Sequence, residues 1–276
     1  MTSTLEKPAT TTAPSATAAA PAKTRRRFNR KWITSWIGVA VLLAAWQIVP
    51  SLGLVERTFL PPLTDVLHAW WGLASGGELW TDIHVSLQRS LSGFGIALGV
   101  GIPLGLLIGW YPIAAELLSP VMAIFLNTAA IALLPVFTLI LGIGETSKIS
   151  IIVYASLWPV LYNTISGVRN VDPLLVKSAR SLGVRNLRLF QKVILPAAVP
   201  TIFTGVRLAG AASILVLITT EMVGAKAGLG YLILNSQFNF QIPQMYAGIL
   251  TVSVIGVAFN YLLLSLERRF STWRTA

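Results

Sequence analysis

The sequence predicts an all-α integral membrane protein with six transmembrane helices. Apolar residues make up 54% of the 276 residues and charged residues only 11%, and the mean hydropathy is +0.72. Ordinary globular domains carry about 25% charged residues, so this chain has too few charges to cover a soluble surface. It also contains six apolar stretches long enough to cross a hydrocarbon core, for which a helix needs about 20 residues.

The charged and metal-binding residue types exclude several other classes of protein. The formal net charge of +11 could indicate nucleic-acid binding. Most of the cations lie beside apolar stretches, however, so we expect membrane lipid and no nucleic acid as their partner. The chain has no cysteine, which excludes disulfides and thiol catalysis, and its two histidines, His68 and His84, are too few for a metal site.

Residues 1–31 are predicted to form a disordered cytoplasmic tail ahead of a membrane domain over residues 32–276. The stretch 2–23 is rich in Thr, Ala and Pro and has almost no large apolar residue, so it cannot bury enough surface to fold. The basic cluster at residues 25–31 then adjoins the first apolar stretch. This arrangement is expected where a chain begins on the cytoplasmic side of a membrane.

The six predicted spans differ in composition. The second contains six glycines and is expected inside the bundle, because small residues let helix backbones approach closely in lipid. The third is interrupted by Pro120, Asn127 and Pro135, so we expect it to be bent or partly interfacial. The spans are residues 33–49, 84–110, 118–143, 149–168, 196–222 and 244–266.

The distribution of cations orients these spans. With the N-terminus inside, sixteen cations fall in cytoplasmic segments and three fall outside, which predicts an even number of crossings with both termini in the cytoplasm. The inner cations are Lys7, Lys23, Arg25, Arg26, Arg27, Arg30, Lys31, Arg169, Lys177, Arg180, Arg185, Arg188, Lys192, Arg268, Arg269 and Arg274; the outer ones are Arg57, Lys148 and Lys226.

The outer segments are expected to be simple. Residues 63–74 form an amphipathic stretch with two tryptophans, which predicts a short helix at the membrane interface. Residues 224–242 are read as a loop that turns at Gly228 and Gly230. Asp82 is interpreted as an ordinary solvated charge, and Glu145 and Lys148 as a solvated turn.

The longest inner loop, residues 169–195, is predicted to present a short helix to the cytoplasm. Asp172 and Pro173 supply a helix start, Gly183 breaks or bends the helix, and Pro196 opens the fifth span. Such a basic, amphipathic segment between two spans indicates a docking surface for a partner protein. The alternative is a loop whose cations only fix topology and contact lipid head groups.

This loop resembles that of the permease subunits of bacterial ABC importers, which carry Glu-Ala-Ala, three residues, Gly, nine residues, Ile, any residue, Leu-Pro. The present chain matches at Ala179, Gly183, Leu195 and Pro196, with Val193 in place of Ile. It departs at Lys177 and Ser178, where the family pattern has Glu and Ala. The resemblance extends from Phe59 to Glu267, with a family-like core at about residues 80–267. Motifs such as Gly142-Ile-Gly-Glu-Thr-Ser-Lys148 and Thr204-Gly-Val-Arg-Leu208 are similar to those of the nitrate, sulfonate, taurine and bicarbonate branch. The resemblance implies that the coupling residues are Lys177, Ser178, Ala179, Arg180, Leu182, Gly183, Leu187 and Pro196.

The resemblance further implies a type I importer in the bacterial inner membrane. Two permease chains, here a homodimer, would form the pathway, and two cytoplasmic ATPases would dock on the inner helices. A periplasmic or lipid-anchored binding protein would deliver a small, anionic solute. The chain has no Gly-x-x-x-x-Gly-Lys-Ser/Thr phosphate loop and no catalytic constellation, so we expect no enzyme and no cofactor here, with ATP and Mg bound by the partner ATPase. The alternative is a secondary carrier driven by an ion gradient.

Polar residues inside the spans are candidates for the pathway. Arg207 could contact an anion, or could extend to the inner surface and serve packing. Asn127 and Thr128 could line the pathway or bond between helices, and Glu221 could be a gate, a structural acceptor or an acid at head-group level. The pathway candidates are Asn127, Thr128, Arg207, Thr219, Thr220 and Glu221.

Overall fold

The computed structural model describes residues 28–270, and their side chains from residue 37 onward. The residues described form helices and turns, with no strand among them. The chain divides into two units, residues 1–46 and 47–276. The helices are α1 (Phe28–Ser51), α2 (Leu63–Gly76), α3 (Glu78–Trp110), α4 (Pro112–Asn127), η1 (Ala130–Leu133), α5 (Leu134–Leu141), α6 (Glu145–Arg169), α7 (Pro173–Ser181), α8 (Asn186–Leu189), the π-helical η2 (Phe190–Ile194), α9 (Leu195–Glu221), α10 (Leu229–Phe238) and α11 (Ile242–Phe270).

Within the described part of the chain, four helical segments are long and apolar enough to cross a membrane, and a fifth is added if a bent pair counts as one span. The four are Glu78–Trp110, Glu145–Arg169, Asn186–Glu221 and Ile242–Phe270. The first predicted span begins among residues whose side chains are not described, so the total of six stays a prediction. Of the predicted tail, residues 1–27 lie outside the described residues, and residues 28–31 form the first turn of α1.

The third predicted span is not one helix. It breaks after Asn127 into α4 and η1–α5, whose axes differ by 84°. The Asn127 Nδ2 donates to Ala123 O at 2.7 Å and the Thr128 Oγ1 donates to Ile124 O at 2.8 Å. These side chains bond carbonyls near the end of α4, and Pro135, which has no N–H, stands in the first turn of α5.

The fifth span also begins earlier than predicted. Helix continues from Asn186 to Glu221 through α8, η2 and α9, so Pro196 lies inside it and does not open it. The wide π turn at Phe190–Ile194 is separated from Pro196 by Leu195 alone. A proline ring is incompatible with a regular upstream α turn, and a π segment is a common way to accommodate such a defect.

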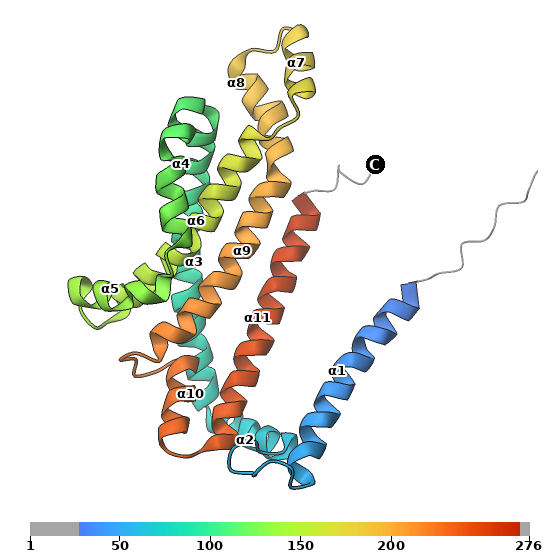
Figure 1. The fold of residues 1–276 in the computed structure, drawn as a ribbon, viewed down its shortest axis with the longest axis vertical. Coiled ribbons are helices and arrows are strands. Elements are labelled where there is room, and N and C mark those ends of the chain that lie inside the picture. The colour runs from blue at the N-terminus through green and yellow to red at the C-terminus, as the bar shows by residue number, and fades with distance from the viewer. Residues whose placement is uncertain (1–27, 271–276) are drawn as a thin grey trace, which may run out of the picture. The chain divides into compact units, whose positions relative to one another are not determined.

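A seam of glycines holds α3 against α6, which run in the same direction (Figure 1). A Cβ added at Gly105 would lie 2.6 Å from Thr164 Cβ, and one added at Gly93 would lie 2.6 Å from Ile152 Cγ2. Gly101 and Gly109 meet α6 in the same way. The glycine-rich span is therefore inside the bundle, as predicted, and its glycines set the approach of the two helices.

The outer segments contain more structure than expected. The predicted helix at residues 63–74 is present as α2, and its position at the interface stays a prediction. Its Trp70 Nε1 donates to Thr251 Oγ1 of α11 at 3.0 Å. The predicted loop at residues 224–242 is wrong in part, because it contains α10. Leu229 is 2% exposed there, so this helix packs into the bundle and does not simply connect two spans.

Candidate functional site

The predicted inner helix exists as α7, and local chemistry defines both of its ends. At the start, Asp172 Oδ1 accepts a hydrogen bond from Leu174 N at 2.8 Å, with Pro173 in the first helical position. At the end, Gly183 has φ +74°, its N–H donates to Arg180 O at 2.9 Å, and Val184 N donates to Ala179 O at 3.2 Å. This pair of bonds is a Schellman motif, so α7 ends where Gly183 predicts.

The α7–α8 pair lies at the end of the bundle where α6 ends and α8 begins (Figure 1). It exposes apolar side chains there. We call Leu174, Leu175, Leu182 and Leu187, which are 51–84% exposed, together with the exposed Lys177 and Arg180, the α7–α8 patch. Ala179 is 8% exposed and anchors α7 to the core, whereas Ser178 is exposed and Pro196 is half-buried. Exposed leucines clustered among cations indicate a surface that another protein covers.

The six pathway candidates do not form one site in this chain. Asn127 is exposed and Thr128 half-buried at the α4–η1 break, and both bond within their own helix and not between helices. Thr220 and Glu221 are each 1% exposed, so they face the interior of the bundle. Glu221 is therefore enclosed by protein, in accordance with the structural acceptor among its expected roles.

Arg207 and Thr219 line a cavity of about 520 Å³ between α9 and α11. Arg207 Nη1 lies 3.2 Å from Glu267 Oε2 on α11. The partner of this intramembrane cation is thus an acid near the end of the last helix. Because both side chains line this cavity, Arg207 and Thr219 remain candidates for contact with a solute.

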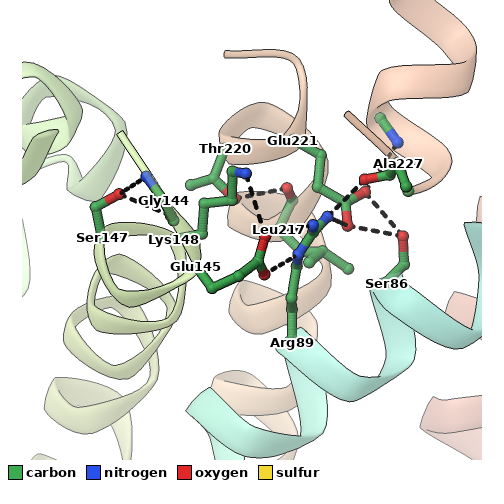
Figure 2. Close-up of polar contacts among 12 residues, drawn as sticks. Ser86, Arg89, Gly144, Glu145, Ser147, Lys148, Leu217, Thr220, Glu221 and Ala227 are labelled. Carbon is green, nitrogen blue, oxygen red and sulfur yellow. Dashed lines mark hydrogen bonds and ion pairs between the residues drawn. The ribbon is translucent and has the colours of Figure 1, made fainter. Parts of the chain in front are cut away.

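A buried ion network at the opposite end of the bundle was not predicted (Figure 2). Arg89 of α3 lies between two carboxylates: its Nη1 is 2.8 Å from Glu221 Oε1 of α9, and its Nη2 is 2.7 Å from Glu145 Oε1 at the start of α6. The Arg89 Nη1 also donates to Ala227 O at 2.7 Å. One guanidinium therefore connects α3, α6, α9 and the segment before α10.

The Glu221 carboxylate is the most enclosed member of this network. Ser86 Oγ donates to it at 2.8 Å, and Gly230 N donates to its Oε2 at 2.9 Å. Leu229 N donates to Ser86 Oγ at 2.8 Å in turn. Removing charges from water is costly unless every lone pair and N–H finds a partner, and these bonds give Glu221 its partners without water.

Two glycines before and within α10 make this packing possible. Gly228 has φ +123°, and a Cβ there would collide with the Glu221 carboxylate. A Cβ on Gly230 would lie 2.7 Å from Glu221 Cβ. Their role is close approach to a buried acid, beyond the turn that the sequence indicates.

The network corrects three interpretations of charged residues. Asp82, expected to be solvated, is 8% exposed, and its Oδ1 accepts a bond from Gly228 N at 2.7 Å. Lys148 is 5% exposed, and Glu145 bonds Arg89 across the bundle. Asp82 and Lys148 are thus buried and not solvated. The Glu145 side chain is 58% exposed, but it is paired with Arg89 and does not belong to a simple solvated turn.

This multi-pass helical membrane protein has relatives among known proteins. Residues 101–272 match the family described as the binding-protein-dependent transport system inner membrane component. The putative aliphatic sulfonates transport permease protein SsuC of Bacillus subtilis (strain 168) is 32% identical over 252 residues, covering 91% of each chain. The taurine transport system permease protein TauC of Escherichia coli (strain K12) is also 32% identical, covering 90% of this chain and 94% of the relative.

A solved structure supports the same fold. The MetNI methionine ABC transporter in an inward-facing conformation aligns with a TM-score of 0.59 and 18% identity, covering 67% of this chain and 92% of that one. The chain therefore belongs to the binding-protein-dependent transport system inner membrane component family, and its fold is that of a type I ABC importer permease. The names of SsuC and TauC describe transport permeases.

Proposed function

We propose that this chain is the membrane-spanning permease subunit of an ATP-driven importer for a small anionic solute. The observation that carries the proposal is the α7–α8 patch, a capped helix with exposed leucines at one end of a transport-family bundle. The names of the relatives, which include sulfonate, taurine and nitrate permeases, favour an anionic solute.

The patch suits a rigid coupling surface. The motif at Gly183 fixes the end of α7, and α8 continues through α9 to Glu221 without a break. At 1.5 Å per residue this helical segment of 36 residues is about 50 Å long. A displacement of Leu187 is therefore transmitted along this continuous helix to Glu221 and the Arg89 network, without an intervening loop.

The proposed assembly follows from this mechanism. A homodimer forms the pathway, one ATPase docks on each α7–α8 patch and binds ATP and Mg, and a binding protein delivers the solute at the Arg89 end. This orientation puts both termini in the cytoplasm of a bacterial cell and the patch at the inner face of the inner membrane, in accordance with the positive-inside rule. The broken third span, with Asn127 and Thr128, and the Arg207–Thr219 cavity are the proposed parts of the pathway.

The test is ATP-dependent uptake of taurine or an aliphatic sulfonate in proteoliposomes containing the chain with its partner ATPase. Leu187→Asp should abolish uptake and weaken co-purification of the ATPase, since it places a charge in an apolar contact. Leu67→Asp is the matched control, because Leu67 is 52% exposed on α2 at the other end of the bundle. Normal uptake by Leu187→Asp, or uptake without any ATPase, would contradict the proposal; the second result would indicate a secondary carrier.

A further inference from the structure

A polar cavity of about 480 Å³ adjoins the Arg89 network between the start of α6, the middle of α3 and the segment before α10. Its charged lining consists of three cations, Arg89, Lys148 and Lys226, and a single carboxylate, Glu145. Gln88 and Ser92 add neutral polar groups. A cavity with this excess of cations attracts anions.

Two of the three cations are buried and share one acid. Arg89 and Lys148 are each 5% exposed. Within residues 37–270, the ionic partner of the Lys148 Nζ is Glu145 Oε1, at 3.5 Å, the same oxygen that accepts from Arg89 Nη2. An ammonium has three donors, so Lys148 retains capacity for another anionic oxygen.

The Glu145 carboxylate shows what chemistry the two cations accept. Its two oxygens face Arg89 Nε at 2.5 Å and Nη2 at 2.7 Å, which is a bidentate contact. Carboxylate, sulfonate and nitrate groups all present a pair of oxygens that fits such a fork. The side chain of Glu145 therefore occupies a position that a small oxyanion could take.

Glu145 is also the member of the network that can leave at little cost. Its side chain is 58% exposed, whereas that of Glu221 is 0% exposed. Gly144 directly precedes it, and Gly142 has φ +80°. If Glu145 turns to solvent, Glu221 and Ala227 O still hold the Nη1 side of Arg89, so the Nε–Nη2 edge stays in place.

We propose that this cavity binds a small oxyanion through the Nε–Nη2 edge of Arg89 and the ammonium of Lys148, in competition with the Glu145 carboxylate. The identification of this anion with the transported solute rests on the proposed function, but its binding does not. An internal competitor keeps the affinity low, because ligand binds only the fraction of molecules whose fork is free. Low affinity suits a site that a solute must leave again.

The test measures binding of methanesulfonate to the purified permease–ATPase complex in a maltoside detergent. Melting temperature is followed against methanesulfonate concentration, with chloride at equal ionic strength as reference, and yields an apparent Kd. Glu145→Ala should lower this Kd by about tenfold if the carboxylate fills the fork in about nine molecules of ten. In the Glu145→Ala background, Lys148→Met should raise it again by about tenfold, the effect of one hydrogen bond to a charged group.

Glu78→Ala is the matched control. Glu78 is an exposed acid that begins α3, as Glu145 begins α6, but it does not contact Arg89, so the Kd should not change. The proposal is overturned if Glu145→Ala fails to tighten binding, if Glu78→Ala tightens it equally, or if chloride acts as methanesulfonate does. Stabilisation by added phosphatidylglycerol but not by methanesulfonate would also overturn it, in favour of a lipid phosphate.

Uptake by the wild-type complex separates this inference from the proposed function. ATP-dependent import together with an unchanged Kd in Glu145→Ala overturns the oxyanion site and leaves the importer standing. A tightened Kd without ATP-dependent import supports the site and contradicts the importer.

Discussion

Gly105→Ala should destabilise the bundle, whereas Gly99→Ala on the same helix should stabilise it. A Cβ at Gly99 meets nothing within 4 Å. A Cβ at Gly105 would lie 2.6 Å from Thr164 Cβ and 3.2 Å from the carbonyl oxygen of Leu161. To reach ordinary contact at 3.4 Å, Thr164 Cβ must retreat by about 0.8 Å. Since a Cβ is bonded directly to the backbone, α6 itself has to move.

Both substitutions gain helix propensity, but only Gly105→Ala also overpacks a tight contact. Replacing glycine by alanine inside a helix stabilises it by about 1 kcal/mol. Overpacking a tight contact costs about 1–3 kcal/mol, and the contact at Gly105 belongs in the upper half of that range because no rotamer change relieves it. We therefore expect a gain of up to about 1 kcal/mol for Gly99→Ala and a net loss of about 1–2 kcal/mol for Gly105→Ala.

The free energy of unfolding can be measured by titrating the detergent-solubilised protein with sodium dodecyl sulfate and following helix content. The result that decides is whether each variant raises or lowers the free energy of unfolding. Both variants are measured in the same detergent, so the detergent does not affect this comparison. If both variants are stabilised by the same amount, the α3–α6 seam is looser than described, and the reasoning from glycine contacts is refuted.

Three other substitutions test the ion pairs. Glu221→Gln should cost about 3–5 kcal/mol, because it removes a charge partner from buried Arg89, whereas Glu267→Gln, in a half-exposed pair, should cost at most about 1 kcal/mol; equal effects in the same unfolding assay would contradict the burial argument. Arg207→Gln should reduce uptake of an anionic solute without impairing ATPase co-purification if Arg207 contacts the solute, and unchanged uptake would assign it to its pair with Glu267 alone.

Features fixed by short stretches of sequence could be predicted. The ends of α7 depend on Asp172, Pro173 and Gly183, whose capping bonds reach only a few residues along the chain. The glycines of α3 likewise predicted a central, tightly packed helix. In both cases the residue type and its immediate neighbours determine the conformation, so no tertiary knowledge was needed.

Features that depend on distant partners could not be predicted in the same way. Arg89 and Glu221 are 132 residues apart, and no local pattern pairs them. A usable signal existed, because a cation and an acid that lie at the same end of two predicted spans must find partners. The extension of the fifth helix through Phe190–Ile194 was missed because Pro196 resembles a helix start, and only packing shows that a π turn accommodates it.

These elements together indicate where the bundle can change shape. The glycine seam fixes α3 against α6. Gly205 brings α9 close to α6 as well, since a Cβ added at Gly205 would lie 2.9 Å from Pro159 O. At the far end Arg89 joins all three helices through Glu145 and Glu221. If the α7–α8 patch receives a displacement, as proposed, we expect this core to move as one body, because packed helices switch between discrete arrangements and do not deform continuously. The 84° break between α4 and η1–α5, with its exposed Asn127, lies outside this core, and we expect the compensating change there.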